Sequence, residues 1–212
     1  MRAPLILPRL YAIADAQVLA TRGIALGDFA RELRAAGVTL AQYRDKVGSP
    51  QEVLGAASVL REAMAGSDCK LIMNDRADLV VLAAFDGVHV GQGDLSPEDA
   101  RRVMDTGKIV GVSTHTEAQV IAANLTSADY IAIGPVFATS TKPDAEPVIG
   151  LEGVRRARAL TTKPLVAIGG ITRANARSVI DAGADSVAVI SALFASGETT
   201  ADIARDFLAR LR

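Results

Sequence analysis

The feature that most constrains the fold is a regular alternation of short apolar runs with amphipathic, helix-like segments along the whole chain. Each apolar run is too short for a helix and is rich in Val, Ile or Leu, which is typical of a strand buried on both faces. Strands that alternate with helices in this way build a parallel sheet. The predicted strands are residues 10–14, 40–43, 71–73, 87–90, 109–112, 130–133, 165–168 and 186–189.

The number of these units predicts a closed barrel. Eight strands with intervening helices in 212 residues fit an α/β fold, a single (β/α)8 TIM barrel, and we expect one domain spanning residues 1–212. An open, doubly wound sheet is the alternative, but no Gly-x-Gly-x-x-Gly follows the first strand. The predicted helices are 28–36, 50–65, 97–104, 117–124, 151–160, 174–182 and 200–211, with a very short one at 77–83.

Three acidic residues lie in similar turns that lead from a helix end into a strand. Asp86, Asp129 and Asp185 each stand one residue before a predicted strand, next to small residues that turn the chain tightly. In a TIM barrel such turns lie at the N-terminal face, whereas chemistry takes place at the C-terminal face. We therefore interpret these three aspartates as structural.

Composition excludes several classes of protein. The net charge is −1 and the charges are scattered, which argues against a nucleic-acid partner. No apolar run approaches the ~20 residues of a transmembrane helix, so we expect no membrane partner. The apolar patch at residues 5–7 is followed at once by Pro8 and Arg9, unlike a signal peptide. Cys69 is the only cysteine, which excludes an internal disulfide and favours a cytoplasmic location. A homo-oligomer is left open.

Polar residues at the end of the second predicted strand suggest an anion site. Strand alternation places Gln42, Arg44 and Lys46 on one side of the chain. In a barrel that side is the lumen, so two cations and an amide converge at its mouth. The alternative is a cluster of charged residues on the protein surface, but such a cluster would not require polar side chains at every second position. We favour a polyanion site.

Two carboxylates follow the next two strands. Asp75 comes after the third strand beside Asn74, and Asp94 follows the fourth. Magnesium typically takes one or two protein carboxylates and fills its remaining positions with phosphate oxygens and water. The alternative is that Asp75 caps the short third helix and that Asp94 sits in a turn. Together with the neighbouring cations, the pair favours Mg2+ bound with a phosphorylated ligand.

Hydroxyl groups dominate the next two strand ends. Ser113 stands at the end of the fifth strand and is the better ligand candidate, whereas Thr114 or Thr116 is suited to cap the following helix. The loop after the sixth strand is the longest in the chain, and long loops are often lids or binding loops. A solvated Ser/Thr-rich loop is the alternative there. Its candidate phosphate ligands are Thr139, Ser140, Thr141 and Lys142.

The last two strand ends offer main-chain groups. Gly169 and Gly170 follow the seventh strand, and Ile190 and Ser191 follow the eighth. In this fold those two loops, with a short extra helix, bind phosphate through backbone N–H groups. The sequence therefore predicts two phosphate-binding zones and two small phosphorylated substrates. His89 falls within the fourth strand, where we expect a hydrogen-bonded core histidine.

These motifs resemble those of the thiamine-phosphate synthase family. Seven strings agree in order and spacing over nearly the whole chain. They are Gln42-Tyr43-Arg44-Asp45-Lys46, Met73-Asn74-Asp75-Arg76, Gly87-Val88-His89-Val90-Gly91-Gln92, Gly111-Val112-Ser113-Thr114-His115, Gly134-Pro135-Val136-Phe137 with Thr139-Ser140-Thr141-Lys142, Ile168-Gly169-Gly170-Ile171 and Val189-Ile190-Ser191.

The resemblance implies a catalytic domain that joins 4-amino-2-methyl-5-(diphosphooxymethyl)pyrimidine to a thiazole phosphate, or to its carboxylated form, and releases diphosphate. It implies Mg2+ bound by Asp75 and Asp94, and catalytic roles for Arg44, Lys46, Ser113 and Lys142. The implied pyrimidine diphosphate ligands are Gln42, Tyr43, Arg44, Asp45, Lys46, Asn74, Ser113 and Lys142. The implied thiazole phosphate ligands are Thr139, Ser140, Thr141, Gly170, Ile190 and Ser191.

Three other functions are weighed against this one. A thiazole tautomerase of the same superfamily uses no diphosphate substrate and should not need Arg44, Lys46 and the two carboxylates. A catalytically silent phosphate-binding barrel should have lost a metal carboxylate or Lys142, and neither is lost. A serine hydrolase at Ser113 would need a Gly-x-Ser-x-Gly elbow, which is absent.

Overall fold

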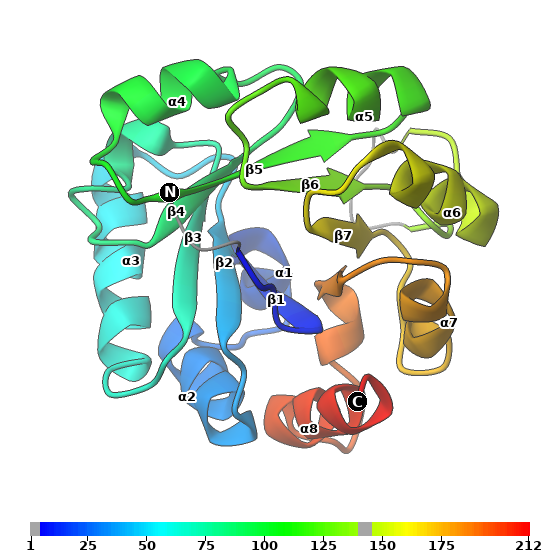
Figure 1. Ribbon diagram of the computed structural model, residues 1–212. Coiled ribbons are helices and arrows are strands. Elements are labelled where there is room, and N and C mark those ends of the chain that lie inside the picture. Colours follow the sequence, from blue (N-terminus) through cyan, green and yellow to red (C-terminus); the bar gives the residue numbers. More distant parts are fainter. Residues whose placement is uncertain (1–4, 140–145) are drawn as a thin grey trace.

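Eight parallel strands close into a barrel in chain order, and β8 pairs with β1 to complete it. The structure is a computed structural model that describes residues 5–139 and 146–212. Figure 1 shows the helices as a ring around the strands, so the predicted (β/α)8 TIM barrel is confirmed. The strands are β1 Leu10–Asp15, β2 Leu40–Arg44, β3 Lys70–Asn74, β4 Gly87–Val90, β5 Ile109–Thr114, β6 Tyr130–Ile133, β7 Leu165–Ile168 and β8 Ser186–Val189.

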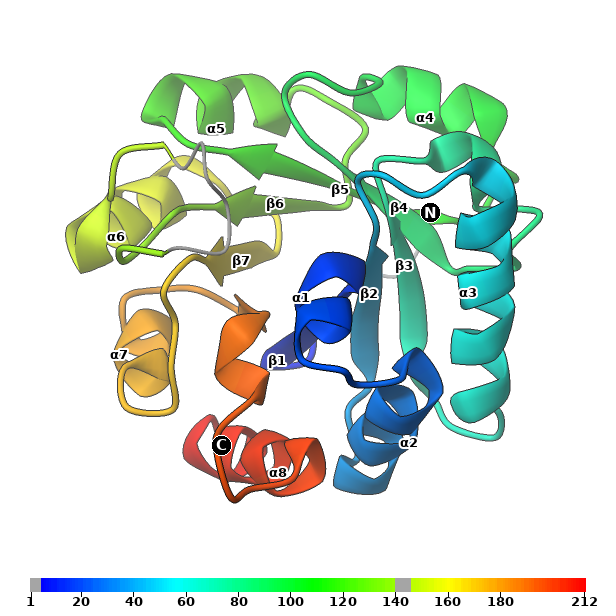
Figure 2. The same ribbon diagram turned by 180° about the vertical axis from the view of Figure 1, so that it is seen from behind.

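The helices follow the predicted order with two additions to the predicted ranges, α1 and the short η2 at Ser191–Leu193. The helix α1, Ala16–Thr21, was not predicted; Figure 2 shows it beside the end of β1, inside the ring of outer helices. The unit after β3 holds only the short 3-10 helix η1, Ala77–Leu79, as predicted. No helix in the described ranges is long and apolar enough to cross a membrane. The others are α2 Leu26–Ala36, α3 Pro50–Ala63, α4 Pro97–Val103, α5 Glu117–Asn124, α6 Gly150–Leu160, α7 Ala176–Asp181, η2 Ser191–Leu193 and α8 Thr200–Arg210.

Local side-chain bonds explain where several helices begin. Ser49 accepts a hydrogen bond from the Glu52 N–H, and the Ser49 N–H donates to the Glu52 carboxylate, so α3 starts with a capping box. Thr116 and Gln119 form the same box at the start of α5. Thr116 is thus the cap, as the sequence suggested, which leaves Ser113 available for the barrel mouth.

Four strands extend farther than their apolar runs. The β1 and β2 strands continue through Asp15 and Arg44, which pair in register. Likewise β3 ends at Asn74, and β5 ends at Thr114. Polar side chains hid these residues from a search for apolar runs, but the backbone ladder continues beneath them. As a result, Arg44, Asn74 and Ser113 stand on strands at the mouth, whereas Lys46 and Asp75 follow on the loops.

The core has two parts. Outward-facing strand residues pack against the helices in the larger cluster. The smaller cluster fills the lumen with inward-facing side chains and includes two fully buried tyrosines, Tyr11 and Tyr130. Their rings meet edge to face at a centroid distance of 6.2 Å. The lumen is therefore packed below the mouth, and its C-terminal end is open to a ligand.

Three aspartates connect neighbouring strands at the opposite, N-terminal face. Asp86, Asp129 and Asp185 each accept the backbone N–H of a residue on the preceding strand, at 2.8 Å in every case. Each carboxylate also binds a basic side chain, from Lys70, Arg101 and Arg158 respectively. Their structural interpretation is confirmed, and they lie far along the strands from the mouth.

We expect Gly111→Ala to lower the free energy of unfolding by about 1–3 kcal/mol, because a side chain there would overpack the lumen. A Cβ at Gly111 would lie 2.0 Å from Cζ of Tyr130. The matched control is Gly55→Ala in α3, where a Cβ would meet no atom within 4 Å. Replacing this helical glycine with alanine should raise the free energy of unfolding by about 0.5–1 kcal/mol. Urea denaturation measures both, and a Gly111→Ala variant as stable as the wild type would contradict the packing described.

Candidate functional site

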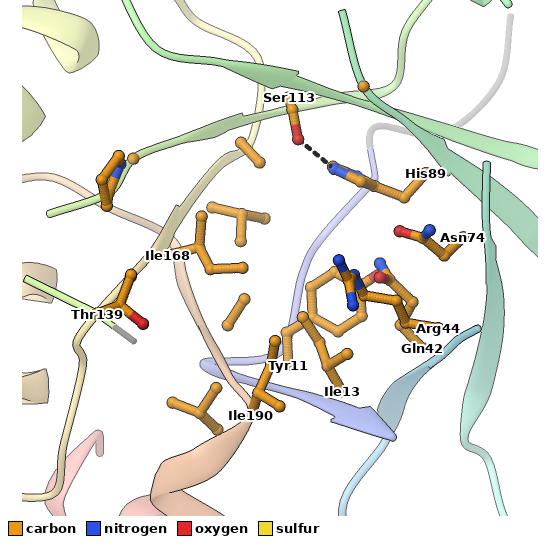
Figure 3. Close-up of a pocket in the computed structure, with 18 of the residues that line it drawn as sticks. Tyr11, Ile13, Gln42, Arg44, Asn74, His89, Ser113, Thr139, Ile168 and Ile190 are labelled. Carbon is orange, nitrogen blue, oxygen red and sulfur yellow. Dashed lines mark hydrogen bonds between the residues drawn. The ribbon is translucent and has the colours of Figure 1, made fainter. Parts of the chain in front are cut away.

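The C-terminal mouth of the barrel forms a cavity of about 730 Å3. Figure 3 shows side chains from several strands pointing into it, with Arg44, Asn74, His89 and Ser113 on one side and Thr139, Ile168 and Ile190 on the other. Most of the described residues singled out in the sequence line this one cavity. They are Gln42, Arg44, Lys46, Asn74, Asp75, Asp94, Ser113, Thr139, Gly170, Ile190 and Ser191.

Two of the singled-out residues lie elsewhere. The Tyr43 ring faces outward into the core between barrel and helices, as alternation requires for the neighbour of Gln42. Its hydroxyl donates to Asp45 Oδ2 at 3.2 Å. Asp45 in turn accepts the N–H groups of Val47 and Gly48, so it shapes the loop after β2. Neither side chain lines the cavity. Ser140, Thr141 and Lys142 lie outside the described residues.

The cations at the end of β2 are anchored by carboxylates. Arg44 pairs with Asp15, which is only 3% exposed and also caps α1 by accepting the Val18 N–H. Lys46 pairs with Asp75. An arginine fixed by a buried carboxylate keeps its remaining N–H donors in one orientation, which suits recognition of a phosphate.

Asp75 and Asp94 meet at the mouth. The Asp75 backbone has φ of 61°, a left-handed conformation uncommon outside glycine, and its N–H donates to the His89 carbonyl at 2.8 Å. Asp94 accepts the Gly91 N–H at 2.7 Å. Burial and contact with the Asp94 carboxyl raise the pKa of Asp75 despite its bond to Lys46. Two adjacent carboxylates of this kind are destabilised without a cation between them.

The donor set at this point is suited to magnesium. Within the described ranges no cluster of three or more His, Cys, Asp or Glu side chains could enclose a metal ion. Two carboxylates beside cationic phosphate ligands leave most coordination positions to substrate oxygens and water, which is the arrangement magnesium prefers. Asp75 and Asp94 therefore fit a cation that binds together with a phosphorylated substrate.

Asn74 adds a donor that lacks a protein partner. Its side chain is buried, with 8% exposure, and its Nδ2 makes no hydrogen bond to any described residue. A buried, unsatisfied amide costs about 1–3 kcal/mol, so such groups are usually satisfied by a ligand or water. Asn74 lines the cavity beside Asp75, but its Nδ2 is itself buried, so the amide would have to rotate to donate to an anion there.

A chain of hydrogen bonds crosses the lumen just below the cavity, and the sequence did not predict it. His89 Nε2 lies 2.8 Å from Ser113 Oγ, and Nδ1 lies 3.0 Å from the Tyr130 hydroxyl. Tyr130 contacts the Tyr11 hydroxyl at 3.1 Å, and Gln42 Nε2 donates to Tyr11 at 2.7 Å. Burial lowers the pKa of His89 to about 4. Strand alternation, which puts His89 on the inward side of β4, was the signal available in the sequence.

The loops after β6 and β7 form the opposite wall. Gly169 and Gly170 have φ of 102° and 62°, and a Cβ on Gly170 would lie 2.5 Å from the Ala138 carbonyl oxygen. Only glycine fits both requirements. Asn175, which sequence reasoning missed, closes this loop: it accepts the Thr172 N–H at 2.7 Å and donates to the Gly170 carbonyl at 3.1 Å.

A second histidine also reaches the cavity. His115 Nδ1 lies 2.7 Å from the Gly134 carbonyl oxygen, which can only accept, so Nδ1 carries a proton. Its backbone N–H donates to Gln119 at 2.6 Å. His115 had no assigned role in the sequence, and its ring is held by the backbone of the β6 loop.

Comparisons with known proteins agree with the fold and the motifs. The profile of the thiamine monophosphate synthase family matches residues 10–193. The thiamine-phosphate synthase of Koribacter versatilis is 55% identical over 195 residues, which cover 91% of this chain and 92% of that protein. The thiamine-phosphate synthase of Chloroflexus aurantiacus is 42% identical over 193 residues, covering 91% of this chain and 88% of the other.

A solved structure is similar over almost the entire barrel. The thiamine phosphate pyrophosphorylase from Pyrococcus furiosus superposes with a TM-score of 0.85 at 32% identity, covering 96% of this chain and 95% of that one. The profile match, the relatives and the cavity lined by the family motifs lead to one conclusion: the chain belongs to the thiamine monophosphate synthase family.

Proposed function

We propose that the chain is a transferase that condenses 4-amino-2-methyl-5-(diphosphooxymethyl)pyrimidine with thiazole phosphate, or its carboxylated form, to give thiamine phosphate and diphosphate. The observation that carries the proposal is the two-sided cavity. One side holds anchored cations and paired carboxylates, and the other is formed by glycine loops with accessible main chain. A site with two such sides suits two phosphorylated substrates that react with each other.

The diphosphate belongs on the cationic side. Arg44, Lys46 and the unsatisfied Asn74 amide line that side together with Ser113. Asp75 and Asp94 would hold Mg2+, which when bound neutralises charge on the diphosphate oxygens. Lys142, outside the described residues, keeps the role that the family resemblance implies for it.

The thiazole phosphate belongs on the opposite side. Gly170, Ile190 and Ser191 lie at the ends of β7 and β8, where TIM barrels commonly bind phosphate through backbone N–H groups. Thr139 lines the cavity on the adjacent loop, and Ser140 and Thr141 follow it in the sequence. The nitrogen of a thiazole bound there faces the pyrimidine across the cavity.

The chemistry needs charge stabilisation rather than a protein nucleophile. The bond between the pyrimidine methylene carbon and oxygen breaks, and its electron pair leaves with diphosphate. Arg44 and Lys46 stabilise that developing anion, while the electron-rich aminopyrimidine carries the positive charge. The thiazole nitrogen then donates its lone pair to the methylene carbon. No proton has to be removed from a side chain in these steps.

The proposal also covers the setting of the reaction. The substrates are small phosphorylated molecules, the chain works as a single catalytic domain, and the reaction takes place in the cytoplasm. The tautomerase alternative gains no support, because anchored cations and paired carboxylates serve a diphosphate, which a tautomerase does not bind.

A direct assay tests the proposal. Purified protein with both substrates and MgCl2 should form thiamine phosphate and an equal amount of diphosphate, measured by chromatography. Omitting either substrate should give neither product. Conversion of a thiazole tautomer without diphosphate release would instead support the tautomerase and overturn the proposal.

A further inference from the structure

The hydrogen-bond chain across the lumen has a direction, and the direction fixes which atom presents a proton to the cavity. Its five side chains come from β2, β1, β6, β4 and β5, in the order Gln42, Tyr11, Tyr130, His89 and Ser113. Every inner member has a partner on both sides. A donor assigned at one end therefore determines each following donor.

The direction begins at Gln42. Its Nε2 faces the Tyr11 hydroxyl and can only donate, so the Tyr11 oxygen accepts this hydrogen bond. The Tyr11 hydroxyl therefore donates its own hydrogen bond to the Tyr130 oxygen. Tyr130 then directs its proton to His89 Nδ1. Each of these hydroxyls is fully buried, so an unused proton would lack a water partner.

At the far end, the same direction sets the histidine and the serine. Nδ1 of His89 accepts, so the neutral ring carries its proton on Nε2 and donates to Ser113 Oγ. The Ser113 oxygen is thereby occupied as an acceptor. Its own proton is then directed into the cavity beside Arg44 and Asn74, where Figure 3 shows the three side chains around one space.

We propose that His89 and Tyr130 are positioning residues that make Ser113 an obligate hydrogen-bond donor to the departing diphosphate, rather than a base or a nucleophile. This rests on the proposed function. The opposite direction would turn the Ser113 proton toward His89 and leave only oxygen lone pairs facing an anion, which is repulsive. The direction inferred from Gln42 complements the charge that leaves.

The two histidines of the chain give the proposal an internal reference. His89 is expected as the Nε2–H tautomer, whereas the Gly134 carbonyl fixes His115 with its proton on Nδ1. Because the sequence contains only these two histidines, their ring signals can be assigned with one His115→Gln variant.

The first experiment is long-range 1H–15N NMR of the ligand-free protein at neutral pH. The unprotonated ring nitrogen resonates far downfield of the protonated one, so the tautomer is read directly. We expect His89 in the Nε2–H form in the wild type and in Tyr11→Phe, because Tyr130 still donates to it there. In Tyr130→Phe that donor is lost, so Nδ1 no longer has a partner that fixes the tautomer, and a population of the Nδ1–H form should appear beside the Nε2–H form.

Activity then separates positioning from a general structural role. Tyr130→Phe should lower kcat severalfold, with little change in KM, because in part of the population Ser113 can now donate to His89 instead of to the diphosphate. If the effect passes through Ser113, the double variant Ser113→Ala/Tyr130→Phe should be no slower than Ser113→Ala alone.

Three results would overturn the inference. They are a wild-type His89 in the Nδ1–H form, a Tyr130→Phe variant with unchanged tautomer and kcat, and fully additive losses in the double variant. The wild-type spectrum decides even if a variant fails to fold. A protein that shows the expected tautomers but makes no thiamine phosphate would refute the proposed function and leave the direction of the chain intact.

Discussion

Asp75→Asn should reduce kcat at least about a thousandfold while leaving the fold intact, because the loss of a proposed ligand of the catalytic metal would remove several kcal/mol of transition-state stabilisation. Asparagine is the right replacement, since the Asp75 backbone has φ of 61° and asparagine tolerates this region. It also keeps the size of the side chain and a neutral partner for Lys46. The loss then reports the missing negative charge rather than a distorted loop.

Asp78→Asn is the matched control. Asp78 lies three positions farther along the chain, in η1, binds Arg76 at 2.6 Å and does not line the cavity. Its variant should turn over normally. Wild-type protein stripped with EDTA should be as inactive as Asp75→Asn and recover on addition of MgCl2, whereas Asp75→Asn should not recover at the same concentration. Normal turnover of the wild type in EDTA would refute the magnesium site.

An electron-withdrawing group in place of the pyrimidine 2-methyl should slow the chemical step by orders of magnitude. Diphosphate departure leaves positive charge on the methylene carbon, and the ring must stabilise it by donating electron density. Binding should change little, because in the proposed site the cations of Arg44 and Lys46 would contact the diphosphate and not the ring substituent. The rate should be measured in a single turnover, since slow product release can mask the chemical step.

Direct displacement gives a different result. There the thiazole nitrogen supplies electron density as diphosphate leaves, and the substituent effect should be small. The control is to repeat the measurement with thiazole phosphate and with its carboxylated form. The ratio of the single-turnover rates of the parent and the electron-poor pyrimidine should be the same with both thiazoles. Equal rates for the two pyrimidines would exclude a rate-limiting cationic step.

The fold could be predicted because its signal is periodic. Buried parallel strands need apolar residues on both faces, and eight such runs specify the barrel. The helix α1 was missed since its six residues are shorter than the window in which an amphipathic pattern can be recognised, and its start depends on a cap from Asp15, itself a strand residue. The ends of β1 and β2 were missed because their last residues are charged.

The site could be predicted only in part, for a related reason. Alternation identifies which side chains face inward, and so Gln42, Arg44 and Lys46 were found together. It does not say which inward side chains touch across the lumen. Tyr11 and Tyr130 are separated by 119 positions in the sequence, and their contact depends on the curvature of the closed barrel. Asn175 was missed because it acts indirectly: it holds the loop after β7, which the sequence had marked as a phosphate loop only through Gly169 and Gly170.

The aspartates at the N-terminal face have a consequence for the history of such a barrel. Asp86, Asp129 and Asp185 tie neighbouring strands together at the end opposite the chemistry. Mutations that reshape the mouth therefore leave these connections untouched, and an ancestor could exchange one set of loops for another without first gaining stability elsewhere. The same separation favours grafting, because loops from another barrel would be installed at the mouth while the aspartate bonds at the N-terminal face stay in place.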